Sequence, residues 1–211
     1  MDPVNPDPRA LGRPTLRQEQ AAVTRRRIAD AARRLFAQDG YAATTLRSVA
    51  AEAGVAVQTV YAVFGSKAAI LAELRSLVVS LPEADSAFEA AMRAATIEAR
   101  LAGFAHSIRQ RWELVGDIVT INEDAARADP SVRAGVEAAR GRRQTGIAAF
   151  VDGLAHDLAP GMDVARTTAL VDACSLYDVY VQLVLVHGWS QDAYEDWLAA
   201  QLISVVLQPC A

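Results

Sequence analysis

The sequence predicts an all-α protein with a small N-terminal helical head and a larger helical C-terminal region. Three observations support this prediction. Alanine is abundant, aromatic residues make up only 6% of the chain, and runs of β-branched residues are few. Apolar residues recur at three- and four-residue spacing, and glycine or proline separates the periodic segments. A chain of 211 residues with 52% hydrophobic content can bury the core that such helices need.

The head is expected to follow a proline-rich arm. Four of the eight prolines precede residue 17, so residues 1–17 are predicted to be disordered. The first helix is expected to start near Gln18 or Thr24 and to end at Asp39-Gly40, where glycine can close the last turn. Its inward-facing stripe follows i, i+4, i+7 and i+8 spacing and consists of Ile28, Ala32, Leu35 and Phe36.

The window between residues 44 and 67 is the most informative part of the chain. Apolar spacing predicts two short helices, at about 45–53 and 57–63, with Gly54 between them. Gly54 can adopt the positive φ that a tight turn requires, and the small Ala50 allows the two helices to approach closely. Two short helices around a glycine turn are the elements of a helix-turn-helix, which places its second helix in the major groove of DNA.

Only helices are expected after residue 66, which gives about nine in the whole chain. Ser66 is predicted to cap the helix that follows it, and Pro82 marks a break. Further helices are expected at about 85–112, with an interruption near Thr96 left open, and at about 114–128, 131–157, 163–187 and 190–207. We place the boundary between a head of residues 18–66 and a C-terminal domain of residues 67–211.

Charge is distributed unevenly along the chain, whose formal net charge is −4. Residues 1–68 carry ten Lys or Arg and six Asp or Glu, a net charge of +4, whereas residues 69–211 carry eleven and nineteen, a net charge of −8. A basic end on an acidic body indicates that only the N-terminal end meets a polyanion. The alternative reading is chance scatter of surface charge.

The remaining composition favours a cytoplasmic protein. Cys174 and Cys210 are the only cysteines, and the acidic, proline-rich start does not resemble a signal peptide. The most apolar stretch, residues 170–186, contains Asp172 and Asp178, which suits a buried helix better than a membrane span. Three scattered histidines show no metal-ligand spacing, so we expect no metal, no cofactor and no membrane association.

The head also holds a longer ordered series of residues: Ile28 through Phe36, Gly40-Tyr41, Thr44-Thr45, Val49-Ala50, Ala53-Gly54-Val55, Thr59-Val60-Tyr61, Phe64 and Ser66-Lys67. Over about residues 20–75 this series resembles the TetR family of bacterial transcriptional regulators. The resemblance implies that the first three helices bind operator DNA and that the fourth links them to a domain that binds a small molecule and dimerises. In the family, ligand binding shifts the fourth helix and releases the DNA.

Eight residues are candidates for contact with DNA: Arg25, Thr45, Arg47, Val57, Gln58, Thr59, Tyr61 and Lys67. Gln58 is the best candidate for reading a base edge, because its amide both donates and accepts hydrogen bonds. Thr45 and Arg47 lie where the N-terminal amides of a helix favour a phosphate. Lys67 opposes the dipole of the helix that it begins, a conflict that a phosphate would relieve. The alternative for each is an ordinary solvated side chain.

The head departs from the family pattern at Ala62 and Val63. Many family members carry a large polar or basic residue after the tyrosine and a histidine at the next position, so this chain has fewer groups that can hold DNA. We therefore expect sequence preference to depend more on Gln58 and on DNA shape, and affinity to depend on Arg47, Lys67 and the arm.

The ligand site is predicted where polar or aromatic residues interrupt apolar helices. The candidates are Trp112, Asn122, Glu123, Tyr177, Asp178, Tyr180 and Gln182. For each of them a purely structural role is an equal alternative. An aliphatic lining would favour a hydrophobic or amphipathic effector.

The last two helices are expected to pair with their mates in a homodimer, whose twofold symmetry requires an inverted-repeat operator. The interface candidates are Val179, Leu183, Val186, Trp197, Leu198, Leu202 and Val205. Two other classes of function stay open. A small helical enzyme would need a nucleophile with a base, or a metal cluster, and we find no such motif, so we expect no enzyme. A protein–protein adaptor that has lost DNA binding is the other alternative.

Overall fold

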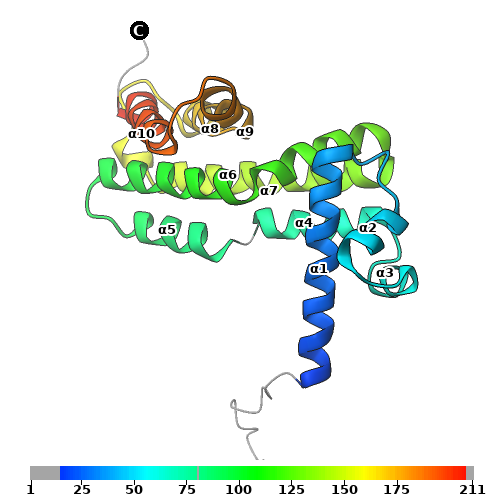
Figure 1. Ribbon diagram of the computed structural model, residues 1–211. Helices are drawn as coiled ribbons and strands as arrows, with labels where there is room; N and C mark the ends of the chain where they lie inside the picture. Colours follow the sequence, from blue (N-terminus) through cyan, green and yellow to red (C-terminus); the bar gives the residue numbers. More distant parts are fainter. Residues whose placement is uncertain (1–14, 80, 208–211) are drawn as a thin grey trace, which may run out of the picture.

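The computed structural model describes residues 15–79 and 81–207, and all regular structure in this part of the chain is helical (Figure 1). The predicted all-α fold class is confirmed. The predicted arm lies largely outside the described residues, as does Cys210. Helix α1 (Leu16–Asp39) begins within the last residues assigned to the arm, because the Thr15 side chain accepts a hydrogen bond from the Gln18 amide and caps the helix.

Helices α2 (Leu46–Ala53) and α3 (Val57–Val63) lie where the sequence predicts them. Thr45 caps α2 by accepting a hydrogen bond from the Ser48 amide at 3.0 Å. Gly54 ends α2 with φ 63° and ψ 41°, the left-handed conformation that its position in the turn requires. Val60 of α3 is fully buried, so the opposite side of this short helix is left on the surface.

Helix α4 (Lys67–Val79) leads from the head into the rest of the chain, followed by α5 (Pro82–Met92). The Ser66 hydroxyl accepts a hydrogen bond from the Ala69 amide at 3.1 Å, as expected of the predicted cap. Pro82 occupies the first turn of α5, where its missing N–H costs no hydrogen bond.

The predicted boundary between helices at 85–112 and 114–128 is wrong. Thr96 caps a single helix, α6 (Ile97–Ala128), which runs unbroken for 32 residues. No proline or capping residue interrupts it between Trp112 and Leu114, and the buried Trp112 and Val115 keep the helical spacing across the expected gap. Asp129 then ends α6 and caps α7 (Pro130–Asp152) by accepting a hydrogen bond from the Ser131 amide at 2.9 Å.

The predicted helix at 163–187 is interrupted. Asp163 caps α8 (Val164–Cys174), but the helix stops at Ser175, and α9 (Tyr177–Tyr180) begins a new segment that continues as the wider π-helical turn η2 (Val181–Val186). The buried Ser175 hydroxyl donates to the carbonyl of Val171 and accepts from Arg143, contacts that sequence spacing cannot reveal. A short turn, η1 (Ala155–Asp157), precedes α8, and α10 (Gln191–Leu207) closes the described chain.

The helices form two buried clusters along the length of α6 and α7 (Figure 1). The first joins the head to one end of α6 and α7, and the fully buried Ile70, Leu71 and Leu74 of α4 lie within it. The second lies among α5, the N-terminal half of α6, α7 and the helices from α8 to α10. Because the head shares its core with α4 and α6, a displacement of α4 cannot leave the head undisturbed.

No single described helix is long and apolar enough to cross a membrane. The pair formed by Val164–Cys174 and Tyr177–Val186, bent by 41° at the break, meets the length and composition criteria only as a pair.

Candidate DNA interface and ligand pocket

The exposed side of α3 presents the residues predicted to read DNA. Gln58 is exposed, and Tyr61 keeps 57% of its surface accessible with no hydrogen-bond partner among the described residues. Val57 and Thr59 are half-buried, and Val57 packs partly against the head core. Ala62 is exposed and Val63 half-buried, so the two positions that depart from the family pattern add no polar group to this surface. Gln58 and Tyr61 are therefore its principal polar side chains.

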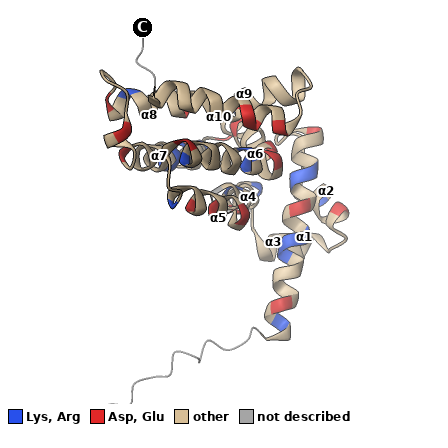
Figure 2. Cartoon of the chain, turned by 90° about the vertical axis from the view of Figure 1, so that its left-hand side faces the viewer, with Lys and Arg blue, Asp and Glu red and all other residues tan. Residues whose placement is uncertain are grey.

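Arg47 stands at the start of α2 next to this surface. It is exposed, and no hydrogen bond or ion pair connects it to another described residue. Thr45 is also exposed, although its hydroxyl already serves as the cap of α2. Arg residues alternate with Asp and Glu residues along α1 (Figure 2), and the longest basic run in this helix is Arg25–Arg27. Arg47 is therefore the cation of the short helices that is most available to a phosphate.

Lys67 has partners inside the chain. Its ammonium donates to the carbonyl oxygens of Tyr41 at 2.6 Å, Thr44 at 2.7 Å and Ala42 at 3.3 Å, and it lies 4.5 Å from the centroid of the Tyr41 ring. Burial lowers the pKa of Lys67, and the charge of Asp129 partly offsets this effect. Three carbonyl oxygens thus stabilise the Lys67 charge, which the dipole of α4 opposes and which suggested a bound phosphate. A DNA contact by Lys67 stays a prediction.

Arg25 is likewise engaged within the protein. Its guanidinium donates to both carboxylate oxygens of Glu73 on α4, at 2.9 and 2.8 Å, and lies 4.5 Å from the centroid of the Phe64 ring. This ion pair raises the pKa of Arg25 and lowers that of Glu73, mainly through the shared hydrogen bonds. Arg25 therefore joins α1 to α4, and its predicted DNA contact is likewise untested.

Two further polar contacts connect the head to α6 and to the residue that ends it. Arg33 of α1 donates to Asp117 at 2.7 Å and to the Leu114 carbonyl at 2.7 Å. Tyr41 donates its hydroxyl to Asp129 at 2.9 Å, and burial together with this carboxylate raises the pKa of Tyr41 to about 12. These contacts hold the head in a defined orientation on the C-terminal domain of residues 67–211, which is called the body from here on.

The body contains a cavity of about 830 Å³, within the usual range for small-molecule sites. It brings together five of the seven predicted ligand residues: Trp112, Asn122, Glu123, Tyr177 and Asp178. Tyr180 and Gln182 do not line it. Tyr180 is instead buried against Tyr194, with ring centroids 5.0 Å apart, and Gln182 is exposed on η2.

The position of Tyr177 depends on a glycine of α6. A Cβ atom on Gly116 would come within 2.1 Å of the Tyr177 ring, so only glycine permits this aromatic wall to approach the helix. Trp112 lies against the same ring, with centroids 5.4 Å apart, and donates its indole N–H to the Ser175 carbonyl at 3.1 Å. Trp112 therefore both stabilises the packing of Tyr177 and Ser175 and lines the cavity.

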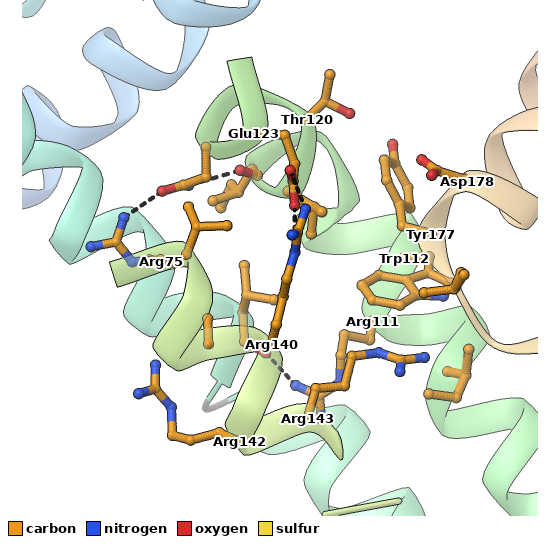
Figure 3. Close-up of a pocket in the computed structure, with 18 of the residues that line it drawn as sticks. Arg75, Arg111, Trp112, Thr120, Glu123, Arg140, Arg142, Arg143, Tyr177 and Asp178 are labelled. Carbon is orange, nitrogen blue, oxygen red and sulfur yellow. Dashed lines mark hydrogen bonds and ion pairs between the residues drawn. The ribbon is translucent and has the colours of Figure 1, made fainter. Parts of the chain in front are cut away.

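The lining is not aliphatic throughout, because charged side chains also take part in it. Six arginines reach the cavity: Arg75, Arg111, Arg127, Arg140, Arg142 and Arg143. Figure 3 shows Arg75 and Arg142 on one side, the rings of Trp112 and Tyr177 on the other, and Arg140 with Glu123 between them. The sequence signal for these charges is the cluster of arginines at 140, 142 and 143, which does not interrupt an apolar helix and so lies outside the predicted ligand residues.

A helix-turn-helix head on a helical body with an internal pocket is the architecture of a ligand-sensing transcriptional regulator. Residues 28–74 match the family model described as bacterial regulatory proteins, tetR family. The resemblance found in the sequence is thereby confirmed: the head matches the tetR-family model, and the chain as a whole has the fold of TetR-family transcriptional regulators. No curated protein sequence matches the chain significantly.

Solved structures agree with this fold over most of the chain. The TetR-family regulator PfmR from Thermus thermophilus superposes with a TM-score of 0.65 at 22% identity, covering 87% of this chain and all of PfmR. NalD, the secondary repressor of the MexAB-OprM multidrug efflux pump in Pseudomonas aeruginosa, gives 0.71 at 18% identity, with 91% and 100% covered. FadR from Bacillus subtilis, in complex with stearoyl-CoA, gives 0.69 at 17% identity, with 86% and 98% covered.

Proposed function

We propose that the protein is a ligand-responsive transcriptional repressor that binds an inverted-repeat operator as a homodimer and releases it when a small molecule enters the pocket. The observation that carries this proposal is the continuity of one buried core from α3 to the pocket. Ile118 belongs to the core that holds the head and also lines the cavity. A ligand in the cavity therefore acts on the same packed unit that positions Gln58 and Tyr61.

In this proposal residues of α3 and of the start of α2 bind DNA. Gln58 reads a base edge, Val57 meets a thymine methyl group, and Tyr61 and Thr59 contact the backbone or groove. Arg47 and Thr45 hold a phosphate at the start of α2. Because binding occurs at an operator on the chromosome, the proposal also places the protein in the cytoplasm.

Dimerisation is proposed to involve η2 and α10. Val186 keeps 60% of its surface accessible and the neighbouring Leu185 62%, which leaves an apolar surface for a twofold mate. Leu198 and Leu202 are fully buried within a single chain and so belong to its own core rather than to the interface. Val179, Leu183, Trp197 and Val205 stay half-buried and available at the edge.

The effector is proposed to be a small molecule with a substantial apolar part. Phe88, Phe104, Ile108 and Trp112 supply an apolar wall large enough to bury one. The FadR structure contains stearoyl-CoA, and NalD is a repressor of an efflux pump. Proteins of this fold therefore include one that binds a ligand with a long apolar chain and one that represses transcription. Neither a helical enzyme nor a protein–protein adaptor is favoured by any of these observations.

An electrophoretic mobility shift on the DNA upstream of the protein's own gene tests the proposal. The unmodified chain should shift this fragment, and rising salt should weaken binding because phosphate contacts release counterions. A variant with Arg47→Ala and Gln58→Ala should lose the shift. The matched control is Arg166→Ala on α8, which removes an exposed arginine outside the head and should shift the fragment normally. Absence of salt-sensitive binding to any promoter fragment near the gene would contradict the proposal.

A further inference from the structure

The charges that line the pocket are not balanced. Six arginines reach the cavity, against the four acids Asp85, Glu123, Asp124 and Asp178. Arg111 pairs with Asp85 at 2.8 Å, Arg127 with Asp124 at 2.9 Å, and Arg140 with both oxygens of Glu123. Arg143 takes its carboxylate, Asp172, from outside the lining. Among the described residues, no carboxylate pairs with Arg75 or Arg142.

Arg75 is held in place by a neutral side chain, and no carboxylate of the described residues pairs with it. Its guanidinium donates to the Asn122 side-chain oxygen at 2.6 Å, and the Asn122 amide nitrogen donates to the Ile118 carbonyl at 2.8 Å, which fixes the orientation of that amide. The other side of the guanidinium lies against α7, where a Cβ atom on Gly135 would come within 2.4 Å of it. A half-buried arginine that is fixed in this way is ready to bind an anion with little further loss of side-chain entropy.

The surroundings of Arg75 disfavour its positive charge. Burial lowers the pKa of Arg75, and the neighbouring positive charge of Arg142 lowers it further. Both effects destabilise the charged guanidinium, and an anion placed between the two arginines would reverse the second of them. The apolar wall on the opposite side, which includes Phe104 and Trp112, suits a molecule whose other end is hydrophobic (Figure 3).

We infer that the effector is an amphipathic anion, a carboxylate or phosphate ester that carries an apolar chain or ring system. Its anionic group binds Arg75 and Arg142, and its apolar part lies against the aromatic wall. This inference deepens the proposed function and rests on it, because it assigns the chemistry of the effector to that same pocket.

The position of Arg75 also connects the anion to the head. Arg75 lies on α4 two residues after Glu73, whose carboxylate binds Arg25 of α1 through two hydrogen bonds. An anion bound to Arg75 therefore acts on the helix that carries the Arg25–Glu73 pair. Arg25 then acts as the link through which the bound anion disturbs the orientation of the head.

Calorimetric titration of the full chain with decanoate, decyl phosphate, decanol and decylamine, each below its micelle concentration, tests the inference. Decanoate or decyl phosphate should bind at least about ten times more tightly than decanol, because a charge-assisted hydrogen bond in a sheltered site is worth that factor. Decylamine should bind most weakly. A preference between the two anions identifies the head group. Decanol binding as tightly as both anions, or no binding by either anion, would overturn the inference.

Variants of the arginines complete the test. Arg75→Met, which keeps an unbranched side chain but removes the charge, should lose about 10- to 100-fold in affinity for the better anion. Arg75→Lys should lose less, and it supplies the test if circular dichroism shows that Arg75→Met fails to fold. Arg93→Met, a change of an exposed arginine that pairs with Glu89 and does not line the cavity, is the matched control and should bind the anion normally. Equal affinity in Arg75→Met and the unmodified chain would overturn the inference.

The titration needs no DNA, so it separates this inference from the proposed function. If the chain binds no operator but prefers the anions through Arg75, the proposed function fails and the anion site stands. If operator DNA is bound and none of the anions binds, the inference fails and the DNA-binding role stands.

Discussion

The DNA-binding head and the pocket use arginine in different ways. In the head, Arg47 is exposed and has no partner among the described residues. In the pocket, Arg111, Arg140 and Arg143 each hold a carboxylate, and Arg75 is the half-buried one that does not. An exposed cation needs no partner in the free protein because water solvates it, whereas a half-buried one is destabilised until an anion arrives.

The comparison teaches that the same residue type carries different information at the two sites. Exposure of Arg47 shows only that it is available, and its DNA role depends on the helix-turn-helix around it. The fixed, unpaired guanidinium of Arg75 itself points to a bound anion. The two regions are nevertheless connected, because the buried cluster that holds the head reaches the pocket at Ile118. Experiments must therefore separate loss of packing from loss of binding.

Ile118→Ala is the substitution expected to have the largest effect, because this fully buried residue belongs to the head core and to the pocket lining. The free energy of unfolding should fall by about 2–5 kcal/mol, the usual result of truncating a buried isoleucine. Urea denaturation followed by circular dichroism measures this loss, and a single transition is expected. Leu114→Ala, at a position that is 47% exposed, should change stability little. Two separate transitions, with only one affected, would show that head and body do not share a core.

Gln58→Ala should weaken operator binding by about 1–3 kcal/mol per half-site and relax base preference at one position, because the amide is the main candidate for direct readout. Fluorescence anisotropy with the operator and with single-base variants measures both effects. Stability should be unchanged, since Gln58 is exposed. An equal loss of affinity for every base variant would place Gln58 on the backbone and leave sequence reading to DNA shape.

Much of the head could be predicted from sequence because its signals are local. Thr45, Gly54 and Ser66 act within a few residues of their own positions, as caps or as the turn. The spacing that places Ile28, Ala32 and Phe36 on one face is also local, and all three are buried. Partners brought together by folding were missed. The carbonyls that bind Lys67 lie 23 to 26 residues earlier in the chain, so sequence spacing offered no sign that its charge was already satisfied.

The pocket shows the same limit more strongly. Trp112, Asn122 and Tyr177 were predicted because polar or aromatic residues stand out in apolar helices. Arg75 and Arg142 are separated by 67 positions in the sequence, and only the packing of α4 beside α7 brings their charges together. The end of α8 at Ser175 was missed because its partners, Arg143 and Trp112, come from other helices.

A matched pair of substitutions, Lys67→Met and Arg47→Met, sharpens the distinction between a structural cation and a DNA-binding one. Lys67→Met should lower the free energy of unfolding by about 1–3 kcal/mol, because three carbonyls lose their donor. Arg47→Met should leave stability within about 0.5 kcal/mol. In operator titrations at several salt concentrations, Arg47→Met should reduce the salt dependence by about 0.9 per half-site, whereas Lys67→Met should leave the slope unchanged. A reduced salt dependence in Lys67→Met, with the loss of stability in Arg47→Met instead, would show that Lys67 is the phosphate contact.

Tyr41→Phe is expected to have the smallest effect on the free energy of unfolding. What distinguishes this variant is how that effect changes at alkaline pH. The folded-state pKa of Tyr41 is raised from 10.0 to about 12, first by burial and then by its hydrogen bond to Asp129. A group whose pKa is higher in the folded state contributes stability that is fully present below its unfolded pKa and is lost as pH rises through the folded value. The unmodified chain should therefore be more stable than Tyr41→Phe at pH 8, and the difference should shrink between about pH 10 and 12. Urea denaturation across this range measures the difference, with Tyr61→Phe on the exposed side of α3 as the control. A difference that stays constant up to pH 12 would show that the Tyr41 hydroxyl does not link the head to the end of α6.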